Sequence, residues 1–127
     1  MSQSQVSPSL DNLLPAEMAR KAENIGITKA NLGPIRMFSL AVLAGAFIAM
    51  GAVFMTTVTT GATGVLTFGI TRLLGGLAFC LGLILVVVGG AELFTGNNLI
   101  VMAWAGGKIN TFRLLRNWVI FYLGNFT

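Results

Sequence analysis

The chain has 127 residues, of which 55% are hydrophobic and 9% are charged. A soluble domain carries about 25% charged residues, so this composition excludes an ordinary soluble domain and indicates an integral membrane protein whose solvent is the lipid bilayer. Histidine is absent and Cys80 is the single cysteine, which leaves no intramolecular disulfide. No spacing indicates a metal site, a nucleotide loop or a catalytic triad, so neither an enzyme nor a cofactor is expected. The net charge of +4 does not indicate nucleic acid, because the basic residues flank apolar runs.

The N-terminal region divides into a tail and a helix. Residues 1–9 are polar and predict a disordered tail. From Leu10 the apolar residues follow a helical spacing, so residues 10–36 are expected to contain an amphipathic helix and a linker on the cytoplasmic face of the membrane. Pro15 suits the first helical position and Gly26 the residue just past the end. Packing on that face and a role in gating are equally compatible with this pattern.

Residues 37–127 read as a transmembrane region. Residues 37–58 carry no charge and, as a helix of about 33 Å, span a hydrocarbon core of roughly 30 Å. This run predicts the first transmembrane helix, followed by a Thr- and Gly-rich loop over 56–67. A single helix over 73–105 would be about 50 Å long, more than a bilayer needs, so the second transmembrane helix is expected to be broken. A third begins within 114–127 and is too short to span, which favours a part of a longer transporter.

Basic residues predict the topology. Four precede the first transmembrane run, one lies between the first and second, and three lie between the second and third. Because loops rich in Lys and Arg stay inside, the N-terminus and the second connection are expected in the cytoplasm, in a multi-pass protein of the cell inner membrane.

The polar segment 92–98 is the predicted break and the main candidate site. Irregular backbone at membrane depth persists only where it is buried in protein or lines a watery cavity, and transporters use such breaks to bind substrate. Thr95 offers a hydroxyl donor, and a helix starting near Asn97 or Asn98 would turn its positive end toward the break. Glu92 is expected to cap unpaired amides and to face away from the pathway, although a base is another role. A plain surface turn between two helical segments is the alternative reading of 92–98.

Some residues outside 92–98 have both a structural and a functional interpretation. Gly75, Gly82 and Gly89 share a helix face and predict close helix packing. Phe79 and Leu83 lie at the edge of that stripe, where bulky residues either form a pore constriction or face lipid. Arg113 and Arg116 either attract anions or anchor the topology, and the second reading is favoured.

Several segments resemble the formate/nitrite transporter family, and within it the formate channels. Residues 90–97 (GAELFTGN) are similar to that family's broken-helix signature. Residues 13–19 (LLPAEMA) resemble its N-terminal helix, residues 75–85 (GGLAFCLGLIL) its second helix, and residues 117–125 the start of its third. The likeness covers residues 10–125.

The resemblance implies an all-α, aquaporin-like helix bundle of two inverted halves, assembled as a homopentamer, with this chain as the first half. It implies a substrate pathway for formate or related small monovalent anions. In it Thr95 is the polar residue of the loop, with Glu92, Gly96 and Asn97 in the same broken-helix segment. Its remaining pathway positions are the loop residues Leu93 and Phe94 and the apolar constriction residues Phe79 and Leu83.

Three functions remain open from the sequence. The chain is either half of such a formate channel, or a non-transporting fragment of one, or part of a channel of the same fold for nitrite, hydrosulfide or neutral solutes. A membrane enzyme is the least favoured class, because the chain holds no catalytic pair.

Overall fold

The computed structural model describes residues 14–127, so the tail predicted at 1–9 and the predicted helix start at residue 10 lie outside the described residues. Over the described range the chain is helical and has no strand apart from an isolated bridge between Thr63 and Leu66. The helices are α1 (Pro15–Ala30), α2 (Pro34–Thr59), α3 (Phe68–Val88), α4 (Phe94–Asn97), α5 (Ile100–Ala105) and α6 (Thr111–Phe126).

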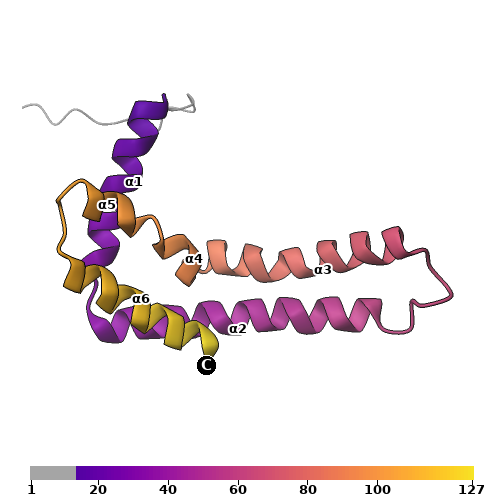
Figure 1. Cartoon of the computed structure of the whole chain (residues 1–127). Coiled ribbons are helices and arrows are strands. Elements are labelled where there is room, and N and C mark those ends of the chain that lie inside the picture. Colours follow the sequence, from indigo (N-terminus) through magenta and orange to yellow (C-terminus); the bar gives the residue numbers. More distant parts are fainter. Residues whose placement is uncertain (1–13) are drawn as a thin grey trace, which may run out of the picture.

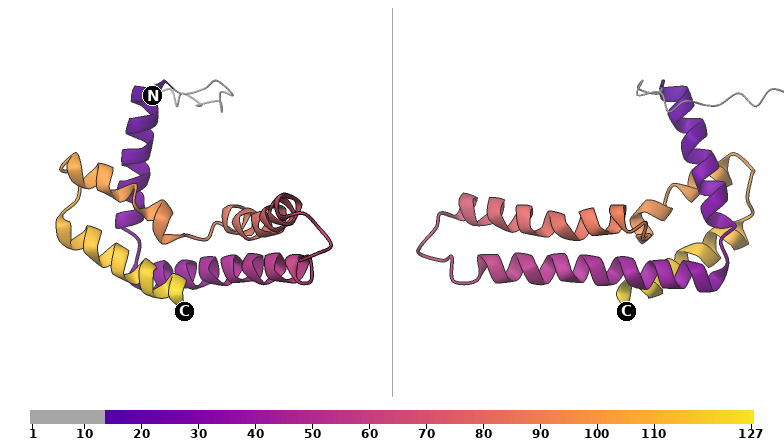
Figure 2. Two further views of the ribbon diagram at one scale, coloured as in Figure 1. Left: turned by 45° about the vertical axis from the view of Figure 1, so that its right-hand side comes forward. Right: turned by 180° about the vertical axis from the view of Figure 1, so that it is seen from behind.

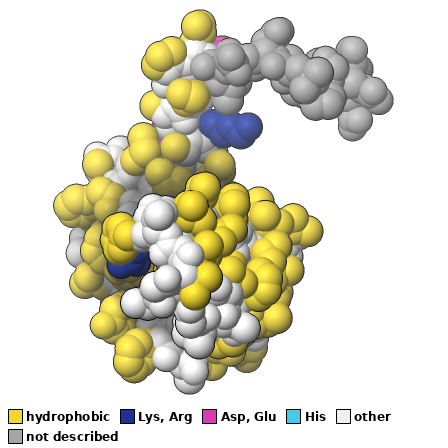
Figure 3. Space-filling view, turned by 90° about the vertical axis from the view of Figure 1, so that its right-hand side faces the viewer, with side chains coloured by type: hydrophobic (Ala, Val, Ile, Leu, Met, Phe, Trp, Pro, Cys, Tyr) yellow, Lys and Arg dark blue, Asp and Glu magenta, His cyan; other side chains and the backbone are white. Residues whose placement is uncertain are grey.

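Helices α2 and α3 form a long antiparallel hairpin, which lies side by side in every view (Figures 1 and 2). They have 26 and 21 residues and mean hydropathies of 2.2 and 2.3, and both are long and apolar enough to cross a membrane. Only 22% of the apolar window of each is buried, whereas the core helix of a soluble protein would be mostly buried. Hydrophobic side chains cover the flanks of the hairpin when it is viewed along its length (Figure 3). The hairpin therefore has the surface of a membrane-embedded unit.

Small residues let the two hairpin helices approach closely. The buried face of α3 carries Gly75, Ala78, Gly82 and Val86. A Cβ added at Gly82 would lie 2.9 Å from the Phe47 carbonyl oxygen and 3.2 Å from the Cα of Gly51. The close packing predicted for the glycine stripe is confirmed at this contact, because no larger residue fits between the two backbones.

Helix α6 packs along the N-terminal half of α2 and runs in the same direction (Figure 1). A Cβ added at Gly124 would lie 2.5 Å from the Ala41 side chain, so these two helices also pack through small residues. Met37, Ala41 and Phe121 form a buried cluster at this contact. A second cluster, made of Ala30, Ile100, Ala103, Ile109 and Leu114, joins α1, α5 and α6.

The two ends of the hairpin differ in charge. Helix α1, helix α5 and the start of α6 lie at one end, and the loop between α2 and α3 lies at the other (Figure 1). Seven basic residues lie in segments at or beside the first end, namely Arg20, Lys21, Lys29, Arg36, Lys108, Arg113 and Arg116. Arg72, near the start of α3, lies toward the other end.

Four helices have boundaries that differ from the prediction, and one of them is α6, which begins at Thr111, before the predicted range 114–127. Helix α1 continues through Gly26, which is buried within it, and ends at Ala30. Helix α3 begins at Phe68, five positions before the predicted Leu73, and includes Arg72, whose guanidinium lies 5.1 Å from the Phe68 ring centroid. Helix α2 extends the predicted run 37–58 to Pro34–Thr59.

Candidate functional site

The break in the second transmembrane unit is set by two glycines. Helix α3 ends at Val88, and Gly90 has φ of +63°, a conformation that favours glycine. The amide of Ala91 donates to the Val86 carbonyl at 3.0 Å, which closes the helix as a Schellman motif. Irregular backbone therefore covers 89–93 and returns in the turn at 98–99, so the predicted break over 92–98 lies within the interruption, which begins three residues earlier, at Gly89.

The chain returns to helix at Phe94, not at Asn97 or Asn98 as predicted. Helices α4 and α5 are short and are separated by a turn at Asn98 and Leu99. Asn97 lies inside α4, is fully buried, and donates its side-chain amide to the Leu93 carbonyl at 3.2 Å. Its role in the structure is to hold the first turn after the break.

Three contacts to neighbouring helices fasten the irregular segment. The Glu92 amide donates to the Leu40 carbonyl on α2 at 3.3 Å. The Phe94 amide donates to Oδ1 of Asn125 on α6 at 2.6 Å, and Asn125 donates from Nδ2 to the Glu92 carbonyl at 3.2 Å. Buried backbone groups need such partners, and here a side chain from another helix supplies two of them.

The Glu92 carboxylate does not cap these amides, contrary to the prediction. Its Oε1 lies 3.5 Å from Nζ of Lys29 on α1, and the two side chains are 16% and 20% exposed. The other oxygen, Oε2, is buried and has no hydrogen-bond partner among the described residues. The carboxylate thus pairs with α1, while Asn125 performs the capping.

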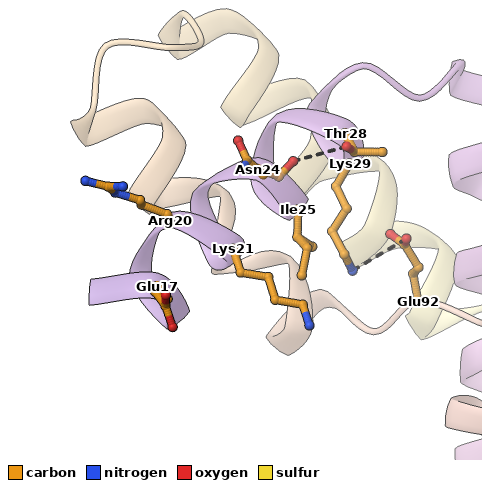
Figure 4. Close-up of a pocket in the computed structure, with 8 residues that line it drawn as sticks. All are labelled: Glu17, Arg20, Lys21, Asn24, Ile25, Thr28, Lys29 and Glu92. Atoms are coloured by element: carbon orange, nitrogen blue, oxygen red, sulfur yellow. Dashed lines mark hydrogen bonds and ion pairs between the residues drawn. The ribbon is translucent and has the colours of Figure 1, made fainter. Parts of the chain in front are cut away.

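A hollow of about 640 Å³ opens beside this ion pair (Figure 4). Helix α1 supplies its lining except for Glu92, and its polar residues include Asn24 and Thr28. Three cationic and two anionic side chains line it, namely Arg20, Lys21, Lys29, Glu17 and Glu92. An entering anion would therefore meet an excess of positive charge next to the break.

Thr95 and Phe94, neighbours in the first turn of α4, have different surroundings. Thr95 is exposed, and its hydroxyl makes no hydrogen bond to any residue in the described part of the chain, whereas Thr56 and Thr71 bond to carbonyls of their own helices. The Phe94 ring is partly buried and makes edge contacts with Trp118 and Tyr122 at centroid distances of 6.1 and 5.9 Å. The packed aromatic residue fixes the turn, and the hydroxyl next to it stays available.

A match to a known protein family identifies the family to which the chain belongs. The family model described as formate/nitrite transporter matches residues 16–127. The chain belongs to the formate/nitrite transporter family. It is 51% identical over 115 residues to the formate channel FocA of Escherichia coli, and 46% identical over 114 residues to FocA of Haemophilus influenzae. It is 34% identical over 113 residues to the probable formate transporter of Methanothermobacter thermautotrophicus.

These matches cover most of this chain and a smaller part of each relative. The two FocA alignments cover 91% and 90% of this chain but 40% of each FocA channel. The alignment with the Methanothermobacter thermautotrophicus protein covers 87% of this chain and 41% of that protein. The chain thus spans about 40% of the length of these formate/nitrite transporter relatives. The relatives are named as channels or transporters and not as enzymes.

The other residues that the family resemblance places on the substrate pathway are half-buried or exposed in the structure. Phe79 is half-buried, and Leu83 is 46% exposed, beside the buried Ala78 and Gly82 that face α2. Leu83 precedes Gly89 by about 9 Å along the helix axis. Leu93 is half-buried and Gly96 is exposed. The structure therefore groups Glu92 to Asn97 at the break and leaves Phe79 and Leu83 farther along the same helix.

Sequence reasoning missed the contacts that the polar residues of α6 make. Arg113 donates to the Asn31 side chain at 2.7 Å, and Arg116 donates to the carbonyls of Ala30 and Leu32 at 3.2 and 3.3 Å. Both arginines hold the elbow between α1 and α2, in addition to any topological role. The signal for Asn125 was an amide side chain directly after the uncharged run 118–124, because a membrane span rarely carries a polar side chain without a partner.

Proposed function

We propose that the chain forms the N-terminal half of an inner-membrane channel for formate or a related small monovalent anion. The observation that carries this proposal is an apolar helix broken at 89–93 and followed by the Thr95 hydroxyl, which has no hydrogen-bond partner among residues 14–127. Membership of the formate/nitrite transporter family and the names of the FocA relatives support the choice of substrate.

The architecture belongs to the same proposal. A second, inverted half would complete an aquaporin-like bundle, and five such protomers would form a homopentamer. Residues 10–36 lie at the cytoplasmic surface and residues 37–127 form the transmembrane region. The grouping of basic segments at the end that carries α1 supports a cytoplasmic N-terminus.

The mechanism follows from the cost of moving a carboxylate out of water. A bare anion in an apolar constriction loses solvation worth many kcal/mol, and the side chains of Phe79 and Leu83 offer no donors. The Thr95 hydroxyl supplies a donor next to the break, together with the amides of Thr95 and Gly96, which have no acceptor within α4. The cationic excess of the α1 hollow raises the local anion concentration at the entrance.

Flux into liposomes tests the proposed function. A channel of full family length containing residues 1–127 should carry formate saturably, with nitrite, hydrosulfide and acetate measured in parallel. The 127-residue chain reconstituted alone should show no saturable formate flux, because the opposite pore wall is missing. Selective flux from the short chain alone would contradict the half-channel proposal, and transport of nitrite or a neutral solute in preference to formate would reassign the substrate.

A further inference from the structure

We propose that Asn125 is the positioning residue that holds the break in its transport-competent shape, an inference that rests on the proposed function. Its carboxamide makes three hydrogen bonds to backbone. Oδ1 accepts the Phe94 amide at 2.6 Å, and Nδ2 donates to the Ala41 carbonyl at 2.8 Å and to the Glu92 carbonyl at 3.2 Å.

Two of these bonds hold the loop on both sides of Leu93, and the third joins the side chain to α2. The Glu92 carbonyl precedes Leu93 and the Phe94 amide follows it, while Ala41 belongs to the unbroken helix α2. One side chain therefore fixes the loop relative to the hairpin. Only a carboxamide offers two donors and an acceptor in one neutral group, so an aspartate would lose the donors and a leucine would lose every bond.

The neighbouring backbone is shaped to admit this residue. A Cβ added at Gly45 on α2 would lie 2.6 Å from the Asn125 carbonyl oxygen. Gly124, which precedes Asn125, packs as closely on Ala41. The two glycines bring α6 near enough to α2 for a short asparagine side chain to reach the loop.

Asn125 acts on transport through the residues that it holds. Thr95 directly follows Phe94, whose amide Asn125 fixes and whose ring packs on Trp118. If the amide is released, the positions of Leu93 and the Thr95 hydroxyl are no longer set by the hairpin. Asn125 itself need not contact the anion.

Amide hydrogen exchange of the full-length protein in lipid nanodiscs tests directly whether Asn125 holds the Phe94 amide. In Asn125→Leu the Phe94 amide should exchange about tenfold faster or more, because it loses its partner. Asn117→Leu is the matched control, since Asn117 is also a buried α6 amide but donates to the Lys29 carbonyl at the elbow. In Asn117→Leu the Phe94 amide should exchange at the wild-type rate. Equal exchange at Phe94 in Asn125→Leu and wild type would overturn the proposal.

Transport measurements separate positioning from a general loss of packing. Per folded channel, Asn125→Leu should raise acetate flux relative to formate, whereas Asn117→Leu should keep the wild-type ratio; an unchanged ratio in Asn125→Leu would contradict the proposal. If Asn125→Leu does not fold, Asn125→Ala replaces it in both measurements, because it also removes the acceptor for Phe94 and both donors. A wild-type channel that carries no anion would refute the proposed function, and the exchange data would still decide whether Asn125 holds the break.

Discussion

Within residues 14–127, Glu92 is the one carboxylate in the broken segment itself, and its partner determines what it can do. Alone, a negative charge there would repel an incoming anion. The ammonium group of Lys29, 3.5 Å from Oε1, offsets that charge and ties α1 to the segment that follows α3. Because both side chains are largely buried, removal of either one leaves the other charge in a poorly solvated place.

At the same scale, the donor role of Thr95 predicts a selective loss of transport. Thr95→Val keeps the shape of the side chain and removes the hydroxyl. Since a hydrogen bond to a charged group contributes about 1.5–3 kcal/mol, formate flux should fall by about tenfold or more while assembly is unchanged. Liposome flux and size-exclusion chromatography of the full-length channel measure the two quantities. Wild-type flux in Thr95→Val would remove the hydroxyl from the mechanism.

The apolar positions on α3 predict a change in selectivity. In the full-length channel, Phe79→Ala and Leu83→Ala should each widen the constriction, so that anions larger than formate leak measurably. The exposed Leu81 on the same helix provides Leu81→Ala as a control, which should leave selectivity unchanged. Wild-type exclusion of larger anions in both test variants would place Phe79 and Leu83 outside the pore lining.

At the scale of the elements, the hairpin depends on the contact between Gly51 and Gly82. Gly82→Val should destabilise the protein by about 1–3 kcal/mol or more, because the added side chain would meet the backbone of α2. Gly76, with no atom within 4 Å of an added Cβ, gives Gly76→Val as the matched control. Thermal unfolding in detergent measures both, and an equal effect of the two substitutions would contradict the packing argument.

The sequence predicted the helices better than their ends. Runs of apolar residues are sufficient to place α2 and α3, but Arg72 was assigned to a loop although it lies within α3, where its guanidinium stacks on the Phe68 ring. The break was located from polar residues, yet Thr95 and Asn97 are helical, and the chain is interrupted earlier, where Gly90 takes a positive φ. Polarity indicated that a break exists, and glycine conformation decided where.

The contacts of α6 were beyond the reach of sequence patterns. Asn125 lies 31 residues from Phe94, and its partners are backbone groups that carry no side-chain signature. The same holds for Arg116, whose recorded partners are the carbonyls of Ala30 and Leu32. Such contacts depend on how the helices are arranged in space.

For the whole molecule, the charge distribution predicts orientation. In a Cys80→Ser background of the full-length channel, cysteines introduced in 60–66 should react with an impermeant maleimide added outside intact cells. Cysteines in 107–110 should react only after the membrane is opened, because that connection shares the basic end of the molecule with α1. The reverse labelling would refute the cytoplasmic N-terminus.

The fastening of the break by α6 has a consequence for how the protein is made. During synthesis the hairpin can form as soon as α3 has left the ribosome, but the Phe94 amide gains its partner only when Asn125, 31 residues later, has emerged. At about 5–20 residues per second, the nascent loop waits roughly two to six seconds without its clamp. During that interval the break is open to water or to insertion-machinery contacts, so the arrival of α6 is the step that closes the loop in biogenesis.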